Sequence, residues 1–395
     1  MKQINVLHLV ASSHGGGATH VRDLALGLPR DRFRSTVAMP LDGGNVSPAD
    51  FTAAGIEFVP LNIAARFTWR ELLPLRRLLR EGGFHLLHVH GARAALYGRL
   101  AAATLRPRPR VLFSIHGFAT PFYSFPKRTI YLWLERALQR VTDCTVCVAQ
   151  AEADLFLSLG LTAQEKARVV PYGIDVARFA APPGTLDDLR NDLGAGPGPV
   201  ILTVCRLNVP RDFASLLAAF RRVRAEFPTA HLLIVGDGPQ RAKIETLIRS
   251  LGLADSAHLT GLRNDVPALM ALADVYVLTS YGWEGYPIST LEAQAAGVPV
   301  IVTDAGGSRE AVRHEETGLV MPKRDPDALA EALLRMLRDP GLRQEMGKAG
   351  RRRARKEFTR ERMVEKITTI YDDNGDEVRS ACSHDPHEFE KNIRP

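Results

Sequence analysis

The fold is decided by residues 280–304, which read SYGWEGYPISTLEAQAAGVPVIVTD. This stretch follows an apolar, β-branched run at 275–278 and ends in a second one at 298–302. The order of strand, tight turn, short helix and strand predicts a βαβ unit of a parallel sheet. Pro287 suits the first helical position, and Gly297 suits the stop after the last one. We therefore expect an open α/β sheet that binds its ligand beyond the carboxyl ends of the strands.

Two carboxylates flank the predicted start of this helix. Glu284 falls in the loop after the first strand, and Glu292 falls more than one turn into the helix. The helix start, around Gly285, Ile288 and Ser289, offers unpaired backbone N–H groups and a positive dipole end, which suit a phosphate. A phosphate would repel both carboxylates, so we expect them to point at hydroxyl groups of a sugar and a ribose. Either glutamate alone would more simply be a solvated surface residue.

The pattern around the two glutamates resembles that of a known family. EGYP at 284–287, the seven residues between the glutamates, EAQAAGVPVI at 292–301 and GGSRE at 306–310 resemble the retaining glycosyltransferases of family 4. The resemblance implies the GT-B fold, in which two Rossmann-like parallel-sheet α/β domains face each other across a cleft. It also implies that Glu284 lies at the transferred sugar and that Glu292 binds the ribose of the nucleotide.

Two segments of the first half follow the order of the same family. The loop with Gly16 and Gly17 connects a buried strand at 6–10 to an amphipathic helix. By resemblance it faces the donor diphosphate, although the residues alone are equally typical of a plain tight turn. His116 ends the strand at 111–115. The resemblance implies that this histidine touches the transferred sugar.

One loop of the second half, at the end of a strand, carries Arg206 and Arg211. Guanidinium groups match phosphate oxygens in shape and charge, so we expect both side chains to clamp the diphosphate. The family usually has glycine where this chain has Cys205, and lysine followed by glycine where it has Arg211 and Asp212. It usually has asparagine at the position of Tyr172. Asp212 tolerates a positive φ less well than glycine, which leaves the shape of this loop open.

The length of 395 residues exceeds what a single hydrophobic core usually spans, so we expect two domains. By resemblance, residues 1–175 form an acceptor-side domain and 176–355 form the nucleotide-sugar donor domain. A helix at 356–371 crosses back onto the first domain. Residues 372–395 are polar, lack periodicity and are expected to be disordered. The pattern TWRE at 68–71 predicts a capping box at the start of a helix.

The chain has a net charge of +7, which favours anionic partners such as a nucleotide diphosphate or an anionic membrane surface. Residues 119–128 mix aromatic and basic side chains, and they suit either a membrane interface or a loop packed over the sheet. The basic run at 351–356 has no aromatic interleaving and no nucleic-acid motif, so nucleic acid is not expected as a partner. No apolar run is long enough to span a bilayer. We expect a cytoplasmic protein, with peripheral binding at the inner face of the membrane as the alternative.

Histidine and cysteine spacing gives little support to a metal site. Cys144 and Cys147 form a C-x-x-C in a β-branched run, where positions three apart face opposite sides and suit packing instead. His88 and His90 share one face of a strand, but no carboxylate or cysteine lies at ligand spacing nearby. Core or cleft-lining histidines are therefore favoured over metal ligands. We expect neither a metal nor another cofactor.

The resemblance implies retaining transfer of a sugar from a UDP- or GDP-sugar to a glycan or lipid-linked acceptor, in the biosynthesis of an envelope polysaccharide. Glu284 and His116 would contact the sugar from opposite sides. The leaving diphosphate itself would accept the proton of the acceptor, so Glu284 is not assigned as a nucleophile. Two alternatives stay open: a sugar-nucleotide epimerase, which needs no acceptor, and a non-catalytic protein that binds nucleotide sugars.

Overall fold

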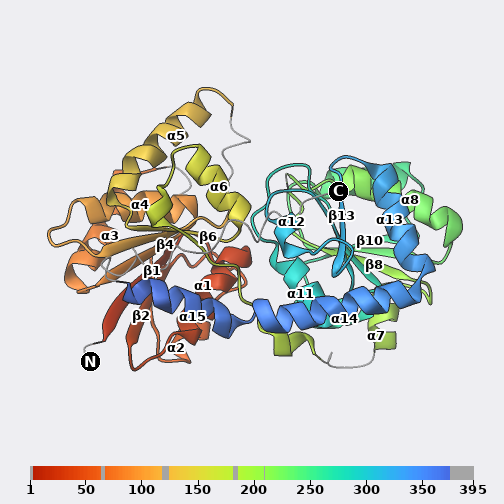
Figure 1. The fold of residues 1–395 in the computed structure, drawn as a ribbon, viewed down its shortest axis with the longest axis horizontal. Coiled ribbons are helices and arrows are strands. Elements are labelled where there is room, and N and C mark those ends of the chain that lie inside the picture. The colour runs from red at the N-terminus through yellow and green to blue at the C-terminus, as the bar shows by residue number, and fades with distance from the viewer. Residues whose placement is uncertain (1–2, 64–66, 118–123, 181–185, 209, 374–395) are drawn as a thin grey trace, which may run out of the picture.

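The chain forms two α/β halves that lie side by side, each built around a parallel sheet (Figure 1). The computed structural model describes residues 3–63, 67–117, 124–180, 186–208 and 210–373. The expected disordered tail lies outside these residues from 374 onward. The first part of the aromatic and basic segment, up to residue 123, also lies outside them.

The first half holds a seven-stranded sheet in the order β3-β2-β1-β4-β5-β6-β7. All its pairings are parallel, and every residue of β4 is buried, as expected where helices cover both faces of a sheet. The strands are β1 (Ile4–Val10), β2 (Phe33–Met39), β3 (Glu57–Pro60), β4 (Leu86–His90), β5 (Arg110–Ser114), β6 (Cys144–Cys147) and β7 (Ala167–Val169). The α-helices are α1 (Gly15–Gly27), α2 (Pro48–Thr52), α3 (Trp69–Glu81), α4 (Gly91–Ala103), α5 (Lys127–Leu138) and α6 (Gln150–Ser158).

The second half holds a six-stranded sheet in the order β10-β9-β8-β11-β12-β13, again with parallel pairings. Its strands are β8 (Val200–Val204), β9 (His231–Val235), β10 (Ala257–Gly261), β11 (Val275–Leu278), β12 (Val300–Thr303) and β13 (Gly318–Met321). Its α-helices are α7 (Leu186–Asp192), α8 (Phe213–Glu226), α9 (Arg241–Ser250), α10 (Val266–Leu272), α11 (Ile288–Ala296), α12 (Ser308–Ala311) and α13 (Pro326–Arg338). The segment 280–304 therefore forms the β11–α11–β12 unit that its sequence predicts.

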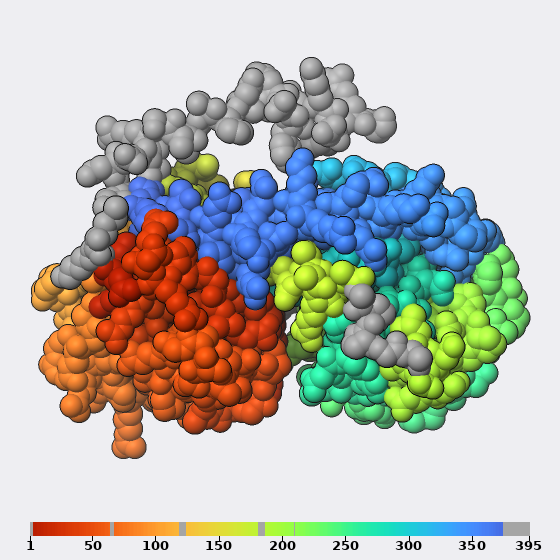
Figure 2. All heavy atoms as spheres, turned by 90° about the horizontal axis from the view of Figure 1, so that it is seen from below, coloured from red at the N-terminus to blue at the C-terminus, as the bar shows by residue number. Residues whose placement is uncertain are grey.

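Two C-terminal helices connect the halves. Helix α14 (Pro340–Glu357) packs against α11, and α15 (Arg360–Asp372) returns to α1 of the first half. Met363 and Ile367 of α15 share an apolar cluster with Leu24 of α1, so the burial of this stripe holds α15 against the first sheet. Figure 2 shows these helices as one blue band across both halves, with a groove between the halves on this face.

Local chemistry at the helix ends departs from expectation in two places. Pro287 is the N-cap residue of α11 and lies outside the helix, which begins at Ile288, whereas Gly297 has the expected left-handed conformation with φ 80°. Thr68 precedes α3 as expected but makes no side-chain capping hydrogen bond. Its backbone N–H donates instead to the hydroxyl of Tyr97 at 2.8 Å. Within the described residues, no helix combines the length and apolar character needed to cross a bilayer.

Candidate active site

Glu284 lies in the loop after β11, as its sequence predicts, and it forms a compact polar group with an arginine. Arg211 Nη1 pairs with Glu284 Oε1, and the same nitrogen donates to Ser280 Oγ at 2.6 Å. Ser280 Oγ in turn donates to the Glu284 carboxylate at 2.9 Å. Both charged side chains are largely buried, at 16% and 11% exposure, so each needs the other. The glutamate is thus held beside the cation that was expected to clamp phosphate.

The two arginines of the expected clamp are placed differently. Arg206 is exposed, and its side chain has no ion pair or hydrogen bond within the described residues. Arg211 is oriented by Glu284 and Ser280, and its Nε is buried without a partner. Asp212 has φ −106° and accepts a hydrogen bond from Ser215 N at 3.1 Å as the N-cap of α8. The loop therefore needs no glycine at this position.

The start of α11 has no side-chain cap, in contrast to three other helices of the same half. Helices α8, α13 and α14 begin with Asp212, Asp325 and Asp339, whose side chains accept backbone N–H groups. Helix α11 follows Pro287 with no side-chain cap. Its first N–H groups are therefore available to an anion, which the positive end of the helix dipole favours.

The glycine loop of the first half meets this helix start. A Cβ on Gly16 would lie 2.8 Å from Ile288 Cδ1, so a larger residue would require the Ile288 side chain to move. Ser289 Oγ accepts a hydrogen bond from the hydroxyl of Tyr276 at 2.7 Å, which fixes its side chain beneath the helix start. Gly17 lies close to the ring of His116, since a Cβ on Gly17 would be 3.9 Å from this ring. The structure thus brings Gly16, Ile288 and Ser289 together across the two halves.

Glu292 of α11 is half-buried and has no hydrogen bond or ion pair among the described residues. Burial raises the pKa of its carboxyl group to about 7, while the charge of Arg178 opposes this shift. A half-buried carboxylate without a partner is a ready acceptor for hydroxyl groups.

His116 occupies a strained position after β5. Its φ is +54°, a left-handed conformation that non-glycine residues rarely adopt and that clusters at functional sites. Its Nδ1 lies 2.7 Å from the hydroxyl of Tyr172, and its Nε2 lies 3.0 Å from His90 Nδ1. Both ring nitrogens are therefore engaged within the protein. Tyr172, which departs from the family pattern, is the residue that orients this ring.

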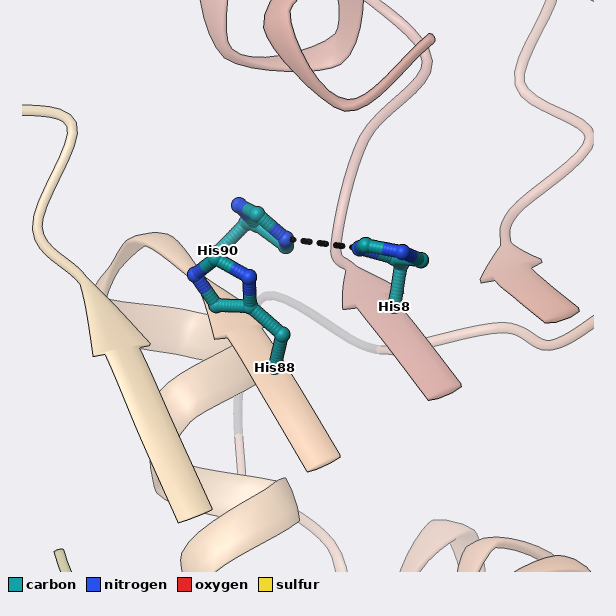
Figure 3. A group of neighbouring side chains, drawn as sticks. All are labelled: His8, His88 and His90. Carbon is teal, nitrogen blue, oxygen red and sulfur yellow. Dashed lines mark hydrogen bonds between the residues drawn. The ribbon is translucent and has the colours of Figure 1, made fainter. Parts of the chain in front are cut away.

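His116 belongs to a histidine cluster that sequence spacing did not reveal. Figure 3 shows His8 of β1 directed at His90 of β4, with Nδ1 and Nε2 3.4 Å apart. His88 bonds to the Tyr371 hydroxyl at 2.7 Å and to Ser114 Oγ at 2.8 Å. The signal was present in the strand register, because His8 and His88 are direct partners across β1 and β4. Spacing along one strand cannot show ligands or partners that neighbouring strands supply.

The two halves touch beside the Glu284 loop. Glu310 of α12 accepts hydrogen bonds from the N–H groups of Gln150 and Ala151 at 2.7 and 2.6 Å, and so caps α6 of the other half. A Cβ on Gly307 would lie 2.8 Å from Ala149 Cβ, so glycine permits this approach. Within α6, burial raises the pKa of Glu152 to about 7.

The cysteine prediction is confirmed. Cys144 and Cys147 are free, buried residues of β6 that belong to different apolar clusters on the two faces of the sheet. Burial raises the pKa of the Cys144 thiol to about 11, so it stays protonated at neutral pH.

Comparison with known proteins agrees with this architecture. The family model "Glycosyltransferase Family 4" matches residues 14–178, and "Glycosyl transferases group 1" matches residues 187–353. A GDP-mannose-dependent alpha-(1-6)-phosphatidylinositol monomannoside mannosyltransferase of Mycobacterium tuberculosis is 32% identical over 70% of this chain and 73% of its own length. An Escherichia coli UDP-Gal:alpha-D-GlcNAc-diphosphoundecaprenol alpha-1,3-galactosyltransferase is 29% identical over 80% of this chain and 83% of its own.

Solved structures share the arrangement of the two halves. The crystal structure of Anabaena Alr3699/HepE in complex with UDP and glucose superposes with a TM-score of 0.82, at 22% identity, over 93% of this chain and 99% of that one. The sucrose-phosphate synthase of Thermosynechococcus elongatus gives 0.78 at 22% identity, over 93% and 98%. The two facing parallel-sheet halves are thus the GT-B fold, and the chain belongs to the group 1 glycosyltransferases of family 4.

Proposed function

We propose that this glycosyltransferase moves a sugar from a UDP- or GDP-sugar to a lipid-linked or glycan acceptor with retention of anomeric configuration. The observation that carries the proposal is the meeting of the uncapped start of α11, Gly16 of the other half and the Arg211–Glu284 pair. Together they offer N–H donors and a positive charge for a diphosphate, beside a carboxylate for sugar hydroxyl groups.

In the proposed reaction, the bond between the sugar and the diphosphate breaks while the acceptor oxygen bonds to the same face of the sugar. The N–H groups at Ile288 and Ser289, with Arg206 and Arg211, stabilise the charge on the departing diphosphate without a metal ion there. That diphosphate accepts the proton of the acceptor hydroxyl. Arg211 exchanges its contact with Glu284 for phosphate oxygens, which frees the carboxylate for the sugar.

The remaining site residues hold the two ends of the donor. Glu292 accepts hydrogen bonds from the ribose hydroxyl groups, which matches its unpartnered carboxylate. His116 faces the sugar from the first half, and Tyr172 and His90 fix its ring. The names of the relatives support both donor classes, since one uses UDP-Gal and another depends on GDP-mannose. They also support lipid-linked acceptors, because a diphosphoundecaprenol and a phosphatidylinositol mannoside appear among them.

The test is transfer by purified protein from UDP- and GDP-sugars to polyprenyl-diphosphate and phosphatidylinositol acceptors, with the product linkage read by NMR. The expected product has the donor's anomeric configuration, and its yield does not change in EDTA. An inverted product would contradict the proposed mechanism. An isomerised sugar formed from the donor alone would indicate an epimerase, and tight donor binding without any turnover would indicate a binding protein.

We also place the protein at an anionic membrane surface on the cytoplasmic side, where a lipid-linked acceptor would be presented. Helix α5 lies at the outer edge of the first half (Figure 1). It exposes large apolar side chains, with Ile130 at 62% and Trp133 at 69%, and Phe125 just before it is 83% exposed. Lys127 and Arg128 lie between them in the sequence and are also exposed. Apolar and basic side chains together suit the interface of an anionic bilayer.

Vesicle flotation with phosphatidylglycerol-containing liposomes tests this placement. The double variant Ile130→Ser and Trp133→Ser should leave the liposome fraction, while the wild type stays in it at low salt. Leu262→Ser is a matched control, because Leu262 is 80% exposed but belongs to the other half. Equal flotation of the double variant and the wild type would contradict the membrane role of α5.

A further inference from the structure

Five imidazoles gather where the strand ends of the first half meet helix α1. His8 comes from β1, His88 and His90 from β4, His116 follows β5, and His20 lies in α1. His20, His90 and His116 each offer one ring nitrogen, and these three nitrogens lie within 4.8 Å of one another. His90 Nδ1 and His116 Nε2 face each other at 3.0 Å. The arrangement therefore presents three nitrogen donors from three separate elements to one point.

His20 supplies a second, independent observation. Its side chain is only 4% exposed, yet among the described residues neither ring nitrogen has a hydrogen-bond partner. Its ring lies at the edge of the His116 ring, with centroids 4.8 Å apart, and of the Tyr172 ring at 5.2 Å. Buried polar groups without a partner are rare in native proteins and call for an explanation such as a bound ion. A metal ion between the three imidazoles would give the His20 ring the partner that it lacks.

We propose that His20, His90 and His116 form a binding site for one divalent transition metal ion, of which Zn²⁺ is the natural occupant. Three neutral imidazoles with an open fourth position are a well-known ligand set for zinc. The site has no carboxylate among its donors, which disfavours Mg²⁺ and Ca²⁺ because these ions prefer oxygen ligands. No ligand of this set belongs to the diphosphate cradle at α11. His116 also faces the proposed sugar site, so a bound ion would hold its ring in place beside the sugar.

The surroundings of the site orient two of the three ligands. The second nitrogen of His116 is bonded to the Tyr172 hydroxyl at 2.7 Å, and that of His90 lies 3.4 Å from His8 Nδ1. Such outer partners fix the ring and the tautomer of metal-binding histidines. Burial also lowers the pKa of His20 to about 4, so no proton competes with a metal ion at neutral pH.

A second group, His8, His88 and His90, also has ring nitrogens within 4.8 Å (Figure 3). It is the weaker candidate, because both nitrogens of His88 are already bonded, to Tyr371 and to Ser114. A metal ion there would have to break one of these hydrogen bonds. At the proposed site a metal ion displaces the one hydrogen bond that His90 Nδ1 and His116 Nε2 share, and His20, without a partner among the described residues, has none to lose.

The experiment uses untagged, full-length protein freed of metal with EDTA and titrated with Co²⁺, a spectroscopic substitute for Zn²⁺. We expect one ion per chain, visible absorption bands typical of nitrogen-ligated cobalt, their loss on addition of Zn²⁺, and a raised Tm with bound metal. His20→Phe replaces an imidazole without hydrogen bonds by an apolar ring, so it should fold, and its Co²⁺ affinity should fall at least about 100-fold. Tyr172→Phe should weaken binding by about 10- to 100-fold through the loss of an outer partner.

His258→Phe is the matched control. His258 pairs with His231 in the second half, with ring nitrogens 3.1 Å apart, so it offers the same chemistry with only two ligands. Its loss should leave the stoichiometry and the spectrum unchanged. Wild-type protein that binds Co²⁺ no more tightly than His20→Phe would overturn the proposal. Binding that survives His20→Phe but disappears in His88→Phe would also overturn it, because the ion would then lie in the second group.

Discussion

The carboxyl ends of the two parallel sheets differ in charge: one carries neutral side chains and the other carries charged ones. In the first half the strand ends gather imidazoles, and burial keeps these uncharged because it lowers the pKa of residues such as His8 and His116. In the second half the same edge carries the ion pair of Arg211 and Glu284, with Arg206 exposed nearby. Both halves use the same strand–loop–helix construction, so the difference lies in the loops and strand ends and not in the scaffold.

This difference indicates how a nucleotide sugar would be divided between the halves. A charged diphosphate needs fixed positive groups, and the second half supplies them through arginine and the open start of α11. A neutral sugar or acceptor needs no fixed charge opposite it, and the uncharged imidazoles of the first half provide none. Glu310 caps α6 across the contact between the halves and would therefore hold the two strand-end regions in a fixed position relative to each other.

The largest expected effect is the loss of stability of metal-free protein as the pH falls from 6.5 to 4.5. Burial lowers the pKa of His8 to about 3 and of His20 to about 4, against 6.5 for an ordinary histidine. Below pH 6.5 the unfolded chain therefore binds protons at these histidines that the folded chain does not bind. The free energy of unfolding consequently decreases as the pH is lowered. At about 1.4 kcal/mol per unit for each group, the two histidines together contribute up to about 5 kcal/mol over this range.

Urea unfolding at several pH values, in EDTA, measures this slope. His20→Phe should lose up to about 3 kcal/mol less than the wild type between pH 6.5 and 4.5, because only one of the two groups remains to titrate. His258→Phe, in the second half, is the control for removing a histidine elsewhere. Parallel curves for the wild type and His20→Phe would show that His20 is not held neutral by its burial.

Removal of the Arg211 charge in the second half should lower turnover more than it lowers the stability of the fold. Arg211→Ala deletes a proposed diphosphate donor, so kcat/KM should fall by about 100- to 1000-fold, the usual cost of a lost transition-state donor. It also leaves the buried Glu284 carboxylate with Ser280 as its remaining partner. Arg222→Ala is a suitable control, since Arg222 forms exposed ion pairs with Asp327 and Glu331. Steady-state kinetics with unchanged kcat/KM for Arg211→Ala would remove Arg211 from the site.

A smaller effect is expected at Glu292. Glu292→Gln should weaken binding of the nucleoside diphosphate by about tenfold, or about 1.4 kcal/mol, measured by calorimetry. Burial raises the pKa of this carboxyl group to about 7, so its ionised form declines below that pH. Wild-type affinity should therefore decrease as the pH falls from 8 to 6 more steeply than that of the glutamine variant. Identical pH dependence in both proteins would mean that the carboxylate does not contact the ligand.

The sequence was informative wherever the information is local, and silent where partners come from distant segments. The two apolar runs, with Gly297 at the helix end between them, were enough to predict β11, α11 and β12. The position of Glu284 in the loop after β11 followed from these elements. The pairing of Arg211 with Glu284 joins residues 73 positions apart, and the histidine cluster joins separate strands. Such contacts depend on sheet order and register, which one strand's spacing does not contain.

The smallest effects concern two helix starts, one in each half, of which only one has a side-chain cap. Asp325 caps α13 through a hydrogen bond from Ala328 N at 2.9 Å, whereas the Thr68 hydroxyl makes no such bond at α3. Asp325→Ala should therefore lower the free energy of unfolding by about 1 kcal/mol, and Thr68→Ala by less than about 0.5 kcal/mol. Urea unfolding of the two variants in parallel measures the difference. An equal loss for both would mean that Thr68 caps α3 in solution, and the contrast between the Asp-capped starts of α8, α13 and α14 and the open start of α11 would then support the anion site less strongly.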